Sequence, residues 1–293
     1  MAFSQIDDSP LKAIGAAQNA DGGWPYCKGG SWTEPTVYAL LAHQAGGAQA
    51  PRADRALDWL LRVQQPDGGW APRPSVQQST WVTALVALLP ARLIGPGRLA
   101  RAVAWLLDQT GMEATPAFHV REFLRDGALP GNPELAGWPW FPGTAAWVTP
   151  TCLAILALDK CYWSCPSSAL RERIEAARGF LLSRRCADGG WNHGSAMALG
   201  YHSDSYPETT GQALLALRGA DPSLLRPSFA LAGRFLSARP PAAAAAWLRL
   251  GLLAHQQLPA ADSSACRTCR TLPDAALTFL ADAAADGHRV FLD

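Results

Sequence analysis

One seven-residue phrase occurs three times in this chain of 293 residues and restricts the folds open to it. It reads QNADGGW over residues 18–24, QQPDGGW over 64–70 and RCADGGW over 185–191. Each copy ends a segment with helical periodicity and is followed by a more apolar segment that opens on a threonine. A unit that recurs in this way predicts a fold of stacked helical hairpins.

Aligned threonines set the register of the repeat, with a unit of about 47 residues and insertions in the later units. These threonines are Thr36, Thr83, Thr151 and Thr210. Trp138 precedes Thr151 by as many residues as Trp70 precedes Thr83, so 137–140 is a degenerate fourth copy of the phrase. In the fifth unit Pro240 and Pro241 replace the phrase altogether.

The two helices of each hairpin differ in polarity. The segment 52–65 is amphipathic and charged on one side, whereas TALVALL, which begins at Thr83, has almost no polar face. We therefore expect outer amphipathic helices and inner apolar ones. Five to six hairpins that bury only their inner helices close on themselves, so the predicted fold is all-α, an α/α toroid with two helix rings and one domain over 1–293.

Composition limits the classes of partner. The formal net charge is +1 and only 17% of the residues are charged, which excludes the basic footprint of a nucleic-acid binder. Twelve tryptophans suit a small apolar or ring-shaped ligand. The first ten residues lack the features of a secretory signal, so we expect a cytoplasmic protein. The apolar stretch 242–256 is too short to span a bilayer, which leaves peripheral membrane contact open.

The repeated phrase resembles the QW motif of squalene and oxidosqualene cyclases. The T-x-x-A-L-L-A segments are similar to repeats of the wider superfamily, which includes the β subunits of protein prenyltransferases. The resemblance covers roughly residues 10–285 and implies chemistry at the first residues of the inner helices. Full cyclases of this kind carry two barrels and this chain has room for one, so a second barrel or subunit could be a partner.

The resemblance points to two glutamates as acids. Class II terpene cyclases open an inner helix with D-x-D-D-T, whose middle Asp protonates an alkene or epoxide. When the threonine of this segment is aligned with Thr36 or Thr210, Glu34 or Glu208 falls at the position of that Asp, although the full motif is absent. A dry cavity would favour the protonated acid, whereas in a wet one both glutamates would be ordinary first-turn carboxylates that support the helix.

Two loops could complete the site. His202 and Asp204 precede Glu208 closely enough to share a pocket with it, and a histidine–carboxylate pair can shuttle protons; the alternative is a solvated loop. The insertion 111–143 has the length of a lid or binding loop. Trp24, Trp70 and Trp191 belong to the repeated phrase, so we expect them to pack the hairpin ends. The candidate substrate-binding aromatics are Trp32, Trp81, Trp138, Trp140, Trp147 and Tyr206.

The cysteines leave a structural zinc site open, and we expect no other cofactor. Cys161 and Cys165 form one pair and Cys266 and Cys269 another, and both pairs follow inner helices. We therefore expect both pairs at the same end of the barrel, where four thiolates could bind zinc; the alternative is free or paired structural cysteines. The helix starts lack the Asp-x-Cys and His ligands that resemblance to a prenyltransferase would require.

Three function classes follow. The first is a terpene-cyclase-like enzyme, an isomerase or lyase, that acts on an isoprenoid or other bulky apolar substrate in an aromatic-lined central cavity. The second is a carbohydrate lyase or hydrolase that uses Glu34 and Glu208 as its carboxylate pair. The third is a non-catalytic binding or scaffold barrel. A closed apolar cavity favours the first class, an open polar groove the second, and a filled centre the third.

Overall fold

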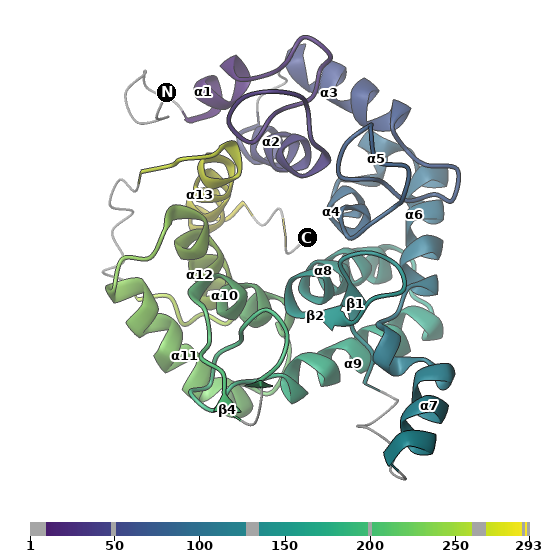
Figure 1. Ribbon diagram of the computed structural model, residues 1–293. Coiled ribbons are helices and arrows are strands. Elements are labelled where there is room, and N and C mark those ends of the chain that lie inside the picture. The colour runs from purple at the N-terminus through teal and green to yellow at the C-terminus, as the bar shows by residue number, and fades with distance from the viewer. Residues whose placement is uncertain are drawn as a thin grey trace.

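Six apolar helices stand side by side in a closed ring (Figure 1). This holds for the residues that the computed structural model describes, which are 10–47, 51–126, 135–198, 201–259, 268–288 and 291. The inner helices are α2 (Thr33–Ala45), α4 (Val82–Ala87), α8 (Val148–Ser164), α10 (Pro207–Ala216), α12 (Ala242–Ala254) and α13 (Leu272–Ala285). Each packs against the next, and α13 packs against α2 to close the ring.

Amphipathic helices surround this ring, as the polarity of the repeat predicts. They are α1 (Pro10–Ala16), α3 (Pro51–Arg62), α6 (Pro96–Asp108), α9 (Ser168–Ser183) and α11 (Pro222–Ser237). The short α5 (Ala91–Ile94) joins α4 to α6. Within the described ranges, five outer–inner hairpins and one further inner helix make up the rings, which confirms the α/α toroid. That 1–293 forms one domain stays a prediction.

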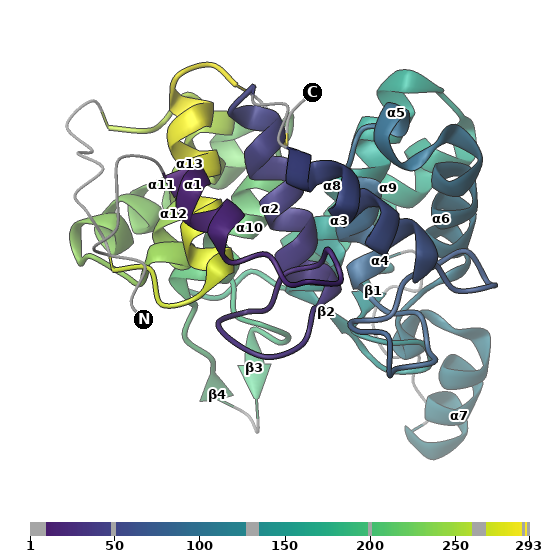
Figure 2. The ribbon, with the colours of Figure 1, turned by 90° about the horizontal axis from the view of Figure 1, so that it is seen from above.

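Short elements lie between the outer and inner helices of the third and fourth hairpins. The 3₁₀ helix η1 (Met112–Ala114) and α7 (Pro116–Asp126) follow α6. Strands β1 (Trp138–Pro139) and β2 (Ala146–Trp147) form one antiparallel pair, and β3 (Met197–Ala198) and β4 (Tyr201–His202) form another. In the side view α7 and both strand pairs lie on the same side of the ring (Figure 2).

The tryptophan of each repeated phrase joins the two helices of its hairpin. Its backbone N–H donates to the aligned threonine hydroxyl of the inner helix, at 2.8 to 3.1 Å in all four copies. Its indole N–H donates to a carbonyl of the outer helix at 2.6 to 2.9 Å. The donor tryptophans are Trp24, Trp70, Trp138 and Trp191. Because these rings are buried and both N–H groups are bonded, the phrase is a structural clamp.

The Asp and Gly residues of the phrase complete the clamp. Asp67 Oδ1 accepts the N–H of Gly69 at 3.0 Å and the hydroxyl of Ser79 at 2.7 Å. Gly68 has φ of +96°, and a Cβ there would lie 2.9 Å from the carbonyl oxygen of Arg101 in the next outer helix. The phrase therefore needs glycine both for its turn and for the contact between neighbouring hairpins.

Backbone hydrogen bonds hold the amino ends of inner helices to the loop of the next unit. Thr33, Trp81 and Val148 donate their N–H groups to Pro72, Trp140 and His193, at 2.8 to 3.1 Å. Each acceptor stands two residues after the tryptophan of its unit. Leu272 of α13 donates in the same way to Tyr26 of the first unit at 2.7 Å, which closes the ring. These helices thus begin at one common end of the ring, which we call the mouth.

Aromatic side chains fill the ring below the mouth. Tyr38 of α2 lies 6.4 Å from Trp247 of α12, and Trp247 lies 5.5 Å from Phe291, measured between ring centroids. All three side chains are buried. The backbones of α10 and α12 touch, since a Cβ on Gly251 would lie 2.6 Å from the carbonyl oxygen of Gly211. The centre of the ring is therefore tightly packed.

Candidate functional site

Glu34 lies in the first turn of α2, at the mouth. The start of α2 is fixed because Thr33 donates its hydroxyl to the carbonyl of Ala71 at 2.6 Å. Tyr26 donates its phenolic O–H to Oε2 of Glu34. The hydrogen bond of Glu34 thus goes to a side chain rather than to a backbone N–H of α2, which distinguishes it from a helix-capping carboxylate. Trp32, at the N-cap position, makes no side-chain cap.

The surroundings of Glu34 favour its protonated form. Burial raises its pKa, the hydrogen bond from Tyr26 lowers it and the charge of Glu208 raises it, so that the pKa lies at about 7. The pKa of Tyr26 is raised well above its usual range by burial and by Glu34, so Tyr26 stays a neutral donor. Oε1 of Glu34 is then the oxygen that can carry a proton.

Glu208 lies in the first turn of α10 and keeps solvent-exposed surface. Its pKa is raised by partial burial, lowered by the charge of His193 and raised by Asp274. Its charge in turn raises the pKa of Glu34 and of Tyr38. Asp274 itself accepts the N–H groups of Arg270 and Thr271 at 2.8 and 2.9 Å, so it caps α13. The mouth thus holds two interacting glutamates in different surroundings.

His193, which sequence reasoning missed, acts on the pKa of Glu208, and the roles expected of His202 and Asp204 stay predictions. His202 and Asp204 are exposed on and after β4, and Asp204 acts on the pKa of Cys186 rather than on that of Glu208. The ring of His193 lies 5.2 Å from that of Tyr206, the residue that precedes α10. His193 and Tyr26 both stand two residues after the tryptophan of their units, a register that could have identified them.

Several of the expected aromatics surround the mouth. Trp32 packs edge-on against Tyr26 at 5.5 Å and carries the guanidinium of Arg73 over its face at 4.9 Å. Trp147 and Tyr206 are exposed at the starts of α8 and α10. Trp81 and Trp140 pack against each other with centroids 4.9 Å apart.

Trp138 does not belong to the mouth, because it is a buried clamp residue. The guanidinium of Arg173 lies 3.3 Å from the centroid of the Trp138 ring and donates to the carbonyl oxygens of Ala136 and Gly137. Arg173 thereby binds the degenerate loop, in which no aspartate precedes the glycine. The expected role of Trp138 in substrate binding is thus replaced by a structural one.

The open part of the ring ends one helical turn below Glu34. Tyr38 is 2% exposed and Trp247 is 1% exposed, so almost none of their surface borders a void large enough for water. On the other side Thr149 donates its hydroxyl to Oε1 of the buried Gln212 at 2.7 Å. We therefore place the candidate site at the mouth, around Glu34 and Glu208, rather than along the axis of the ring.

The three described cysteines of the expected zinc site do not lie together. Cys161 and Cys165 lie at the carboxyl end of α8, whereas Cys269 lies three residues before the amino end of α13, at the mouth. The expected shared end was wrong because Cys269 is closer to the following inner helix than to the preceding one. Cys266 lies outside the described residues. Across the described ranges no three His, Cys, Asp or Glu side chains are arranged to hold a metal ion, and burial raises the pKa of Cys161 to about 11.

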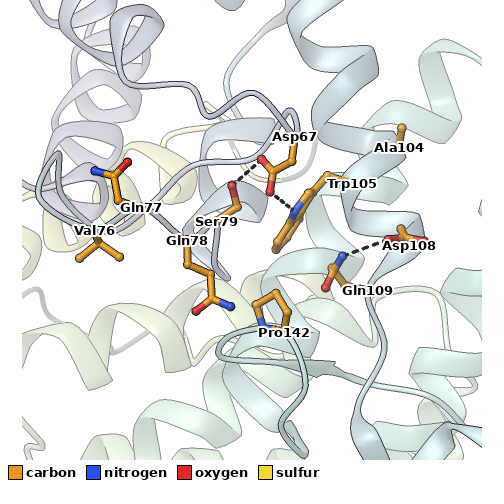
Figure 3. Close-up of a pocket in the computed structure, with 10 residues that line it drawn as sticks. All are labelled: Asp67, Val76, Gln77, Gln78, Ser79, Ala104, Trp105, Asp108, Gln109 and Pro142. Carbon is orange, nitrogen blue, oxygen red and sulfur yellow. Dashed lines mark hydrogen bonds between the residues drawn. The ribbon is translucent and has the colours of Figure 1, made fainter.

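A polar groove of about 770 Å³ lies between the second unit and α6 (Figure 3). Asp67 at its edge accepts the indole N–H of Trp105 at 3.0 Å and the hydroxyl of Ser79. The groove is lined in part by Gln77, Gln78 and Asp108 and does not include Glu34 or Glu208. Asp67 makes these bonds as part of the clamp, and we assign no chemistry to the groove.

No family model matches the chain. A segment of 63 residues, 21% of the chain, is 41% identical to a drimenyl diphosphate synthase of Streptantibioticus cattleyicolor and spans 12% of that protein. A structure of the type II terpene cyclase MstE from Scytonema, bound to geranylgeranyl dihydroxybenzoate, has 20% identity and a TM-score of 0.52 over 93% of this chain and 76% of MstE.

A glucanase shares the fold as well. The endo-β-1,4-glucanase CMCax from Acetobacter xylinum has 15% identity and a TM-score of 0.61 over 96% of this chain and 99% of the glucanase. At such identities both structures establish the α/α toroid fold and nothing finer. No helix in the described part of the chain is long and apolar enough to cross a membrane.

Proposed function

We propose that this chain is a terpene-cyclase-like enzyme in which Glu34 protonates an alkene or epoxide of an isoprenoid substrate. One observation carries the proposal: Glu34, at the start of an inner helix, has a pKa of about 7 and is held by a neutral tyrosine. An acid with a pKa near neutrality keeps a large protonated fraction at pH 7, which a general acid requires. The resemblance to QW-repeat cyclases, the local identity to drimenyl diphosphate synthase and the fold shared with MstE support it.

The initiating step follows from the geometry around Glu34. The O–H bond at Oε1 breaks, and the π electron pair of the substrate alkene forms a new C–H bond, leaving a carbocation on the substrate and a carboxylate on Glu34. The hydrogen bond from Tyr26 to Oε2 stabilises that carboxylate. The π pair of a second alkene then closes a ring. The exposed rings of Trp147 and Tyr206 can stabilise positive charge on the substrate.

The second glutamate suits the opposite role. Glu208 is more exposed than Glu34; burial raises its pKa, and the interaction with His193 opposes that rise. A carboxylate at that place can accept the proton that the cyclised cation loses, which restores a neutral alkene. Two carboxyl groups whose environments differ in this way can divide acid and base roles.

Cyclisation in D₂O tests the proposal. Polyprenyl alcohols and diphosphates of increasing chain length are incubated with the protein, and products are analysed by mass spectrometry. Acid initiation predicts one solvent deuterium in each cyclised product, and Glu34→Gln should abolish the product while Glu172→Gln on the exposed face of α9 should not. Products without solvent deuterium, or an active Glu34→Gln variant, would exclude Glu34 as the acid.

A carbohydrate enzyme is the second candidate, favoured by the TM-score of 0.61 to the glucanase. Glu34 and Glu208 would then act as a pair across the open mouth, with Trp147 and Tyr206 as exposed stacking surfaces. Release of reducing ends from a soluble β-1,4-glucan, lost in both glutamate variants, would support it. If neither substrate class is turned over, the packed centre of the ring favours a non-catalytic binding barrel.

A further inference from the structure

A groove of about 460 Å³ lies between α8, α9 and the residues that follow α10. Because α8 begins at the mouth, its last turn, which lines this groove, lies at the opposite end of the ring. The groove includes neither Glu34 nor Glu208. It is therefore separate from the mouth, and we call it the far groove.

The carboxylates that line the far groove are already paired with arginines. Arg178 donates through Nη2 to the buried Asp159 at 2.7 Å, and Nε of Arg218 lies 3.7 Å from the same carboxylate oxygen. Arg178 also donates through Nη1 to Glu175 at 2.7 Å. Arg171 adds a third positive charge to the lining. A cation would have to displace an arginine from its carboxylate, whereas an anion meets an excess of positive charge.

Arg171 and Tyr162 offer hydrogen-bond donors to such an anion. Nε of Arg171 donates to the hydroxyl oxygen of Tyr162 at 3.2 Å, and the guanidinium lies 5.8 Å from the centroid of the Tyr162 ring. Within the described residues, the Nη groups of Arg171 and the hydroxyl hydrogen of Tyr162 have no acceptor. A guanidinium beside a phenol suits a carboxylate or phosphate, whose oxygens accept several hydrogen bonds.

Trp163 adds a flat apolar surface beside these donors. It lines the far groove, yet its side chain is 77% exposed. Its ring centroid lies 6.2 Å from that of Tyr162, with the two planes inclined by 71°. A ligand ring that stacks on Trp163 would cover apolar area that is now open to solvent. The volume of the groove is also that of a small-molecule pocket.

We propose that the far groove binds a small aromatic anion, a flat ring that carries a carboxylate or a phosphate. The ring stacks on Trp163, and the anionic group accepts hydrogen bonds from Arg171 and Tyr162. An isoprenoid chain lacks the flat ring that this arrangement fits. The far groove is thus a second site, and its occupation does not depend on the chemistry proposed for Glu34.

Titration with benzoate, phenyl phosphate, benzamide and acetate tests the site. The NMR signal of the Trp163 indole N–H locates binding, and isothermal titration calorimetry measures the affinity. At least one of benzoate and phenyl phosphate should shift that signal to saturation, and the tighter of the two identifies the anionic group. Benzamide lacks the charge and acetate lacks the ring, so each should bind at least about tenfold more weakly than that anion.

Three variants assign the contacts. Arg171→Gln should lose the preference for the aromatic anion over benzamide, and Trp163→Leu should lose the preference for it over acetate. Arg226→Gln removes an exposed guanidinium from α11, outside the groove, and is the matched control for net charge. It should bind like wild type. Equal far-UV circular dichroism and melting temperature would show that all three variants are folded.

Three results would overturn the inference: a Trp163 signal that neither anion shifts, benzamide or acetate that binds as tightly as the aromatic anion, or equal weakening by Arg226→Gln and Arg171→Gln. Because no isoprenoid is added, binding by a protein that cyclises nothing would remove the proposed function and leave the far groove in place. Glu34→Gln should accordingly bind the aromatic anion as tightly as wild type does.

Discussion

Tyr26 donates its phenolic hydrogen to Glu34 while its backbone carbonyl accepts the N–H of Leu272 at 2.7 Å. A residue that lowers the pKa of Glu34 is therefore also the residue that closes the ring. Tyr26 lies in the loop before α2 and Leu272 begins α13, so a hydrogen bond from the last inner helix to the loop of the first hairpin fixes the donor. The pKa of Glu34 thus depends on closure of the ring.

Removing the phenolic hydroxyl should raise the pKa of Glu34. The hydrogen bond from Tyr26 favours the carboxylate, and a bond to a charged group contributes about 1.5–3 kcal/mol, or roughly one to two pKa units. Tyr26→Phe should therefore move the Glu34 pKa above 7. Titration of labelled glutamate carboxyls by NMR measures it, and an unchanged or lower pKa would contradict the role of Tyr26.

Neutralising the second glutamate should have the opposite effect. Glu208 raises the pKa of Glu34 through its charge. Glu208→Gln should therefore lower the Glu34 pKa, by less than about one unit because Glu208 is solvent-exposed. The same NMR titration tests this, with Glu172→Gln as a control that leaves the Glu34 pKa unchanged. If Glu208→Gln and Glu172→Gln shift the pKa of Glu34 equally, the two mouth glutamates are not coupled.

The raised pKa of Glu34 makes folding stability depend on pH. Between the unfolded value near 4.3 and the folded value of about 7, the folded state binds more protons than the unfolded state. The stability contribution of Glu34 is thus complete below about 4 and is lost as pH rises through 7. Urea unfolding at pH 5 and pH 8 should show this loss in wild type and a smaller one in Glu34→Gln. The same loss in both proteins would count against the raised pKa.

The threonine of the clamp should be more important for its hydroxyl than for its shape. Thr83 accepts the N–H of Trp70 at 2.9 Å in a buried place. Thr83→Val keeps the shape but leaves that N–H unsatisfied, which should cost about 1–3 kcal/mol of unfolding free energy. Thr83→Ser keeps the acceptor and should cost less. Chemical denaturation of both variants provides the comparison. If Thr83→Ser loses as much unfolding free energy as Thr83→Val, the hydrogen bond does not account for the loss.

Two glycines with positive φ provide a matched test of the contact between hairpins. Gly68 has φ of +96° and faces the backbone of Arg101, whereas Gly219 has φ of +83° and open space around it. Gly219→Ala should cost about 1 kcal/mol through backbone strain alone. Gly68→Ala adds a clash with backbone, and should cost at least about 2 kcal/mol. Melting curves of the two variants measure the difference, which would vanish if hairpin packing were loose.

The repeated phrase made the ring of helices predictable from the sequence. The contacts that could not be predicted lie where the sequence departs from that phrase. The spacing from Trp70 to Thr83 recurs from Trp138 to Thr151, so the inner-helix register could be deduced without structure. The clamp role of Trp138 follows from the same register. Its contact with Arg173 could not be predicted, because Arg173, which holds the degenerate loop, stands 35 residues later in the sequence.

The candidate site was predictable only in part for a similar reason. Glu34 and Glu208 share a position in the repeat and could be aligned. Tyr26 and His193 share one as well, two residues after the clamp tryptophan, but their residue types differ. The hydrogen bond from Tyr26 to Glu34 and the effect of His193 on the pKa of Glu208 appear only in the structure. The packed centre of the ring is formed by Tyr38 and Trp247 from opposite parts of the chain, which no local pattern connects.

The bond from Leu272 to Tyr26 also bears on how the chain is made. On the ribosome the first hairpin emerges long before α13, so the carbonyl of Tyr26 has no native partner until the residues around 272 have been synthesised. In an open stack of hairpins each repeat can complete its contacts as soon as it is synthesised. In this ring the first hairpin lacks one of its neighbours until the last inner helix has been made. We therefore expect the mouth, and with it the surroundings of Glu34, to be among the last parts of the protein to form.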